Sequence, residues 1–231
     1  MMRFPARGLA VFGLLVVSVF VLTGCWNPFA PDPGKTKPRP PADYHERLTP
    51  DDVIHNIETA YVWEDLDEYL DCLSEDFVFY PNEEDVQQNP EEIPPEWYKS
   101  DERRVHENMF SDNPPEGMPV VDEVKLTLTT SSIVHDEGPD PVDPLDDIYI
   151  YTVDVDLRVF TEGGTVYLAT APSEFHFRVD TDQQGDGGEP WWEIFQWFDL
   201  NPATPGPARG TAQDPLTERV SLGELLSLFS R

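Results

Sequence analysis

Apolar residues recur at helical spacing in the first half of the chain and at every second position in much of the second half. From Val53 to Tyr61 they follow one face of a helix, which Thr49 is suited to cap. A second helix is predicted over residues 101–111, with Ser100 as its N-cap. The early part of the folded region is therefore expected to be helical.

Five segments are predicted to be strands: residues 77–80, 120–130, 148–160, 166–179 and 191–200. An acidic, proline-rich loop is expected over residues 82–95, and acidic turns over residues 136–147 and 180–190. The longer strands have one apolar and one polar face, which is typical of an antiparallel sheet covered on one side. Helices followed by strands indicate the α+β class.

The first residues have the layout of a secretory signal. Arg3 and Arg7 precede an apolar stretch over residues 8–22, too short to cross a hydrocarbon core that needs about 20 such residues. The run Leu22-Thr23-Gly24-Cys25 resembles the lipobox of bacterial lipoproteins. This resemblance implies cleavage before Cys25, diacylglycerol on its sulfur and acylation, as with palmitate, of the new amine. The alternative is an ordinary signal peptide with a chance cysteine.

These features divide the chain into four expected parts: a signal peptide (1–24), a proline-rich tether (25–48), a folded domain (49–200), and a linker with a short helix (201–231). In a Gram-negative cell, Trp26 after the cysteine would imply an outer-membrane lipoprotein facing the periplasm. The tether carries a basic cluster, which either belongs to a plain spacer or lies against lipid headgroups: Lys35, Lys37 and Arg39.

The charge balance is strongly acidic, with 45 Asp and Glu against 15 Lys and Arg and a formal net charge of −30. Such a surface repels phosphate backbones, so nucleic acid is not an expected partner. The acidic surface is interpreted in three ways: it keeps the protein soluble, it associates with divalent cations, or it adapts the protein to a salty environment. Of the two cysteines, Cys25 would be lipidated, which leaves Cys72 without a partner for an intrachain disulfide. Cys72 is expected to be a small buried residue rather than a nucleophile.

Several segments resemble nuclear transport factor two-like (SnoaL-like) domains: residues 56–61, 67–70, 77–79 and 192–194, with Trp197 and Asp199. Trp97, His106 and residues 108–110, and the tail over residues 223–229, are similar to a lipoprotein branch of that family. The resemblance implies a cone, in which a curved antiparallel sheet wraps around helices and leaves a pocket at the open end. The family often dimerises, but charged side chains on the outer sheet face favour a monomer here: Asp154, Asp156, Glu174 and Arg178.

The second helix holds the strongest candidate chemistry. Glu102 and His106 are four residues apart on one face, next to apolar side chains that should meet the sheet. A histidine held by a carboxylate is a general-base arrangement where a pocket adjoins it, although such pairs are more often structural. The cone-fold resemblance also implies proton chemistry for Asp199, at the end of the last strand. The alternative is that Asp199 caps the strand or bonds the backbone, because Asp commonly closes strands and turns.

A set of large side chains is expected to line the pocket or to fill the core: Tyr61, Tyr80, Trp97, Met109, Phe110, Trp192 and Trp197. No cofactor or metal is expected. Asp180, Asp182 and Gly185 match three positions of a calcium loop, but Trp191 stands where the bidentate Glu is required, so a hairpin is predicted there.

Two functions fit the sequence. The first is a non-catalytic, membrane-anchored envelope lipoprotein whose cone domain binds a small apolar ligand or an envelope protein. The second is an isomerase, hydrolase or dehydratase that uses His106 with Glu102 or Asp199 for acid–base chemistry. Only the enzyme requires two titratable groups that converge on a cavity open to solvent.

Overall fold

The computed structural model describes residues 43–136, 147–200 and 217–230. The signal peptide, Cys25, the basic cluster of the tether and most of the turn predicted over residues 136–147 lie outside these ranges. None of the described helices is long and apolar enough to cross a membrane.

Five helices are described: α2 (Pro50–Trp63), α3 (Leu66–Asp71), α4 (Glu83–Gln88), α5 (Lys99–Met109) and α6 (Leu222–Ser227). Thr49 caps α2 as predicted, and its side chain accepts a hydrogen bond from the backbone N–H of Asp52 at 3.2 Å. Glu64 ends α2 in the left-handed region, with φ of 53°, and the chain then turns into α3.

Seven strands form one sheet: β1 (Leu73–Tyr80), β2 (Trp97–Tyr98), β3 (Val121–Asp136), β4 (Ile148–Thr161), β5 (Val166–Gln184), β6 (Pro190–Asp199) and β7 (Thr217–Arg219). The order is β2-β1-β6-β5-β4-β3, and β7 pairs with β5. The α+β class with N-terminal helices and a curved sheet is thus confirmed. The sheet is mixed rather than wholly antiparallel, because β1 pairs with β6 and β7 pairs with β5 in parallel, whereas the other pairs are antiparallel.

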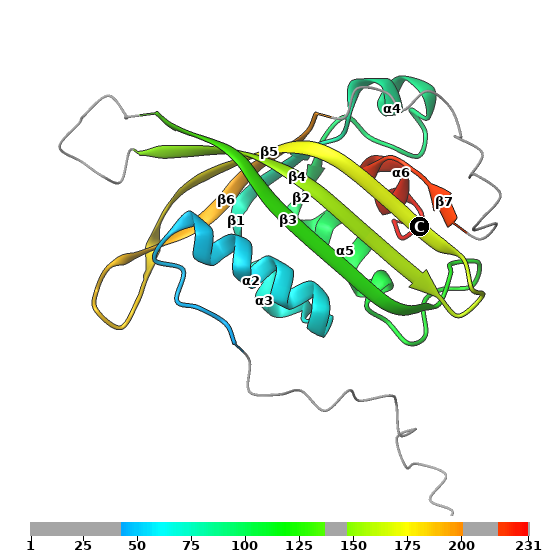
Figure 1. The fold of residues 1–231 in the computed structure, drawn as a ribbon, viewed down its shortest axis with the longest axis horizontal. Coiled ribbons are helices and arrows are strands. Elements are labelled where there is room, and N and C mark those ends of the chain that lie inside the picture. The colour runs from blue at the N-terminus through cyan, green and yellow to red at the C-terminus, as the bar shows by residue number, and fades with distance from the viewer. Residues whose placement is uncertain (1–42, 137–146, 201–216, 231) are drawn as a thin grey trace, which may run out of the picture. The chain divides into compact units, whose positions relative to one another are not determined.

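The core lies between the sheet and the helices. The apolar face of β4 and β5 is buried in alternation, as the sequence pattern predicts. Helix α2 contacts β3, α5 contacts β1, and α6 contacts β5, so Figure 1 shows the long strands passing over packed helices. Leu225 and Phe229, in and just after α6, are fully buried and join the same core cluster. The folded domain therefore includes residues beyond 200.

Several predicted boundaries were wrong for local reasons. Helix α5 begins at Lys99 rather than after Ser100, because the Asp101 carboxylate accepts the backbone N–H of Tyr98 at 3.0 Å and fixes the N-cap there. The loop predicted over residues 82–95 contains α4, which Asn82 caps through the N–H of Glu84. The hairpin predicted over 180–190 is shorter, and β3 is longer, because pairing continues along their neighbouring strands.

Candidate binding site

A chain of polar side chains runs through the centre of the helical layer. Tyr61 of α2, Tyr69 of α3, and Glu102 and His106 of α5 are each no more than 1% exposed. The Tyr69 hydroxyl donates to Glu102 Oε2 at 2.8 Å, and the Tyr61 hydroxyl lies 2.6 Å from His106 Nε2. The predicted placement of Glu102 and His106 on one buried face is confirmed. We refer to these four residues as the buried network.

The hydrogen bonds define where the protons of the buried network lie. His106 Nδ1 is 2.8 Å from the carbonyl oxygen of Glu102, which can only accept. Nδ1 therefore carries the proton, and Nε2 of a neutral His106 accepts from the Tyr61 hydroxyl. Glu102 Oε2 is 3.3 Å from His106 Nδ1, while Glu102 Oε1 has no hydrogen-bond partner among the described residues.

Burial decides the charge of this pair. Desolvation raises the pKa of Glu102 to about 7 and lowers the pKa of His106 to about 4. The hydrogen bond from Tyr69 opposes the shift in Glu102 but is the smaller effect. Desolvation also raises the pKa of both tyrosines well above 10, so they stay protonated. In mildly acidic solution Glu102 and His106 are both neutral, and their contact is not a salt bridge.

The remaining candidate acid, Asp199, ends β6 and is 5% exposed. Its backbone pairs in register with Ser173 of β5. Asp199, Glu102 and His106 do not line any of the three surface clefts of about 370, 450 and 520 Å³ in the described part of the chain. The structure thus joins Glu102 to His106 but brings neither to solvent.

The large side chains predicted to line the pocket mostly fill the core. Those that are nearly or fully buried are Tyr61, Trp97, Met109 and Trp197, whereas Tyr80, Phe110 and Trp192 are half-buried. Trp97 also lines the cleft of about 450 Å³, together with Arg104 and Ser227. Cys72 is fully buried, and desolvation raises the pKa of its thiol, as expected for an inert residue.

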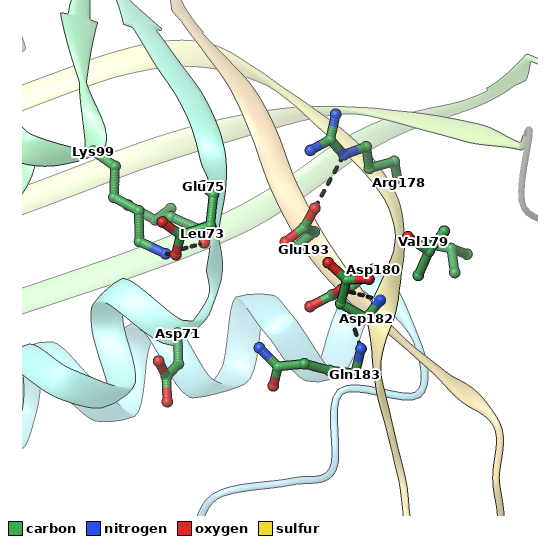
Figure 2. A pocket seen from close by; sticks show the side chains of 11 residues that line it. Asp71, Leu73, Glu75, Lys99, Arg178, Val179, Asp180, Asp182, Gln183 and Glu193 are labelled. Carbon is green, nitrogen blue, oxygen red and sulfur yellow. Dashed lines mark hydrogen bonds and ion pairs between the residues drawn. The ribbon is translucent and has the colours of Figure 1, made fainter.

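The largest of the three clefts, of about 520 Å³, opens where β1 and β6 separate (Figure 2). Leu73 pairs with Ile194, but the next pair is Val78 with Gln196, so β1 bulges away from β6 between these points. Lys99, at the start of α5, lies on one side of the opening. Figure 2 shows that Arg178 of β5 faces it from the other.

Both cations of this cleft already have acidic partners. Lys99 Nζ lies 2.7 Å from Glu75 Oε1 and donates to the carbonyl of Leu73 at 2.8 Å. Arg178 donates through Nε to Glu193 at 3.0 Å and also bonds Asp76. The sequence placed Arg178 on the outer sheet face but gave no reason to join it to Lys99. The one indication that the sequence offered was that basic residues are scarce in this acidic chain.

The loop that resembles a calcium site is a hairpin, as predicted. Asp180 Oδ1 accepts the backbone N–H groups of Asp182 and Gln183 at 2.8 and 3.2 Å. No group of three or more His, Cys, Asp or Glu side chains able to hold a metal ion occurs within the described ranges.

Together these features define an α+β domain with a sealed polar network in its core and a charged cleft on its surface. Among solved structures, the chain is similar to a conserved protein from Planctomyces limnophilus (14% identity, 64% of this chain and 88% of that one, TM-score 0.43). It is also similar to an NTF2-like protein of unknown function in nutrient uptake from Rhodospirillum rubrum (13%, 63% and 92%, TM-score 0.39). A ketosteroid isomerase-like protein from Erwinia carotovora atroseptica is a third (12%, 66% and 94%, TM-score 0.42).

No protein-family profile matches the chain, and neither does any curated protein.

Proposed function

We propose that this chain is an exported lipoprotein, anchored to a membrane through Cys25, whose folded domain binds a partner rather than catalysing a reaction. The observation that carries the non-catalytic part is the burial of Glu102 and His106, which are 1% and 0% exposed. A general base must come within hydrogen-bond reach of the proton that it removes. Here Tyr61 occupies His106 Nε2, and the backbone of Glu102 occupies Nδ1.

The polar surface cleft supports a binding role. Lys99 and Arg178 hold two positive charges among the five acidic side chains that line the cleft, and each is fixed by a carboxylate. Such preset charges fit a polar or charged partner better than the small apolar ligand expected from the cone resemblance. We further propose that the domain acts as a monomer in the cell envelope, without nucleic acid. In a Gram-negative cell, Trp26 favours the outer membrane.

The anchor is tested by metabolic labelling with palmitate and detergent phase separation of the full chain. Wild type should carry label and enter the detergent phase, and Cys25→Ser should lose both. Cys72→Ser is the matched control, because Cys72 is fully buried and should leave labelling unchanged. A Cys25→Ser protein that kept its label and its partitioning would overturn the proposal.

A further inference from the structure

The outer edge of the sheet is formed by β3. It pairs with β4 on one side and with no described strand on the other. Over residues 129–136 every side chain is exposed, on both faces of the strand, and Ile133 and Val134 are 52% and 55% exposed. Figure 1 shows this end of β3 extending past the start of α2. Backbone groups on such an edge are a template for a further strand.

This edge lacks most of the usual protection against strand addition. Residues 126–134 contain no charge, proline or glycine, in a chain in which 26% of residues are charged. Glu58 of α2 accepts the outward N–H of Leu128 at 2.7 Å and so caps the edge at that point. No described side chain does the same for Thr129 to Val134. A bulge between Thr130 and Ser132 twists the strand but leaves the edge open.

The charges around this edge indicate what could dock there. Asp154 lies opposite Thr129 on β4 and is exposed, and Asp136 ends β3. Two nearby groups that can carry positive charge already lie against acids: Lys125 is 3.1 Å from Glu123, and His135 is 3.2 Å from Asp147. A second copy of the chain would bring the same acids and a further net charge of −30 to the interface. Charge complementarity therefore favours a basic occupant.

We infer that the β3 edge from Thr129 to Val134 is a docking site for an extended, basic segment of a partner protein, which adds a strand to the sheet. Main-chain hydrogen bonds supply the affinity, and Ile133 and Val134 offer one apolar contact on each face. This inference rests on the proposed binding role, and it names the surface and the chemistry of the partner.

The test uses the full chain in detergent and two labelled peptides, KKTVTVTVKK and its acidic counterpart EETVTVTVEE, with binding followed by fluorescence anisotropy. The basic peptide should bind at least tenfold more tightly than the acidic one. Ile133→Lys should weaken that binding at least tenfold. Leu200→Lys should change it less than twofold, because it makes a similar substitution at a position of similar exposure (44%) just after β6, which β5 and β4 separate from β3.

Equal loss of binding in both variants would show attraction to net charge alone and would overturn the inference. So would a wild-type chain that ignores the peptide but self-associates in sedimentation until Ile133→Lys is introduced. Circular dichroism confirms that both variants are folded. The lipid anchor is tested separately, by the palmitate label in the Cys25→Ser experiment. Peptide binding does not affect that label, so the two proposals can fail independently.

Discussion

The buried network predicts an unusual dependence of stability on pH, which two single variants should reveal. In the unfolded chain, Glu and His titrate near 4.5 and 6.5, and between these values the pair holds one proton, on His106. In the folded protein the pair also holds one proton, but it lies on Glu102. Because folding moves a proton within the pair without net uptake, the wild-type pair contributes almost no pH slope in this range.

Glu102→Gln leaves the histidine alone. Unfolded His106 takes up a proton below pH 6.5, whereas the folded residue resists protonation down to about pH 4. Stability is therefore retained above pH 6.5 and lost as the pH falls from 6.5 to 4. At about 1.4 kcal/mol for each pKa unit, this loss relative to wild type amounts to roughly 3 kcal/mol.

His106→Asn leaves the acid alone and reverses the sign. Folded Glu102 keeps its proton up to about pH 7, while the unfolded residue releases it near pH 4.5. Stability is then greatest below pH 4.5 and falls as the pH rises to 7, again by roughly 3 kcal/mol.

Free energies of unfolding from urea titrations between pH 4 and pH 7 measure both slopes, with the wild-type profile subtracted. Glu107→Gln makes the same chemical change on the exposed face of α5 and should leave the profile unchanged. Slopes of the same sign in the two variants, or no slope in either, would refute the neutral pair and indicate an ion pair or a hydrated network.

Three further predictions concern stability and accessibility. Arg178→Gln should lower the free energy of unfolding by about 1–3 kcal/mol, because it removes the side chain that links Asp76 of β1 to Glu193 of β6. Arg158→Gln, which breaks an exposed ion pair, should change it by no more than about 0.5 kcal/mol. Phe229→Ala should lower the free energy of unfolding by about 3–5 kcal/mol, because it opens a cavity in the core. Leu228→Ala should lower it clearly less, because Leu228 is half-buried, and thermal and urea unfolding compare the two variants. Cys72 should react with a thiol reagent only under unfolding conditions, and rapid labelling of the native protein would contradict its sealed position.

Patterns local to one element predicted much of the fold. The cap at Thr49 and the alternation along β4 depend on neighbouring residues, and both were recovered from the sequence. The four-residue spacing of Glu102 and His106 placed them on one face for the same reason. What the spacing could not reveal was that Tyr61 of α2 closes the site, because that contact joins residues 45 positions apart.

The surface cleft was beyond sequence reasoning for a related reason. It results from the parallel pairing of β1 with β6 and from a break in their register, which no local pattern encodes. Lys99 and Arg178 come from elements that are distant in the sequence, so only the scarcity of basic residues could have drawn attention to them. Ser100 shows a different kind of error. It was predicted to cap α5 because Ser is a good capping residue, but the carboxylate of Asp101 accepts the backbone N–H of Tyr98 and moves the N-cap to that residue.

The place of β1 inside the sheet also affects how the domain can form. Its partner β6 comes more than a hundred residues later, so α2, α3 and β1 have no complete sheet to pack on until most of the domain has been made. Contacts so distant along the chain form slowly. A nascent chain of this kind stays extended for longer than one whose first strands pair as a hairpin. Late folding of this kind is compatible with passage through a narrow export channel before the core closes.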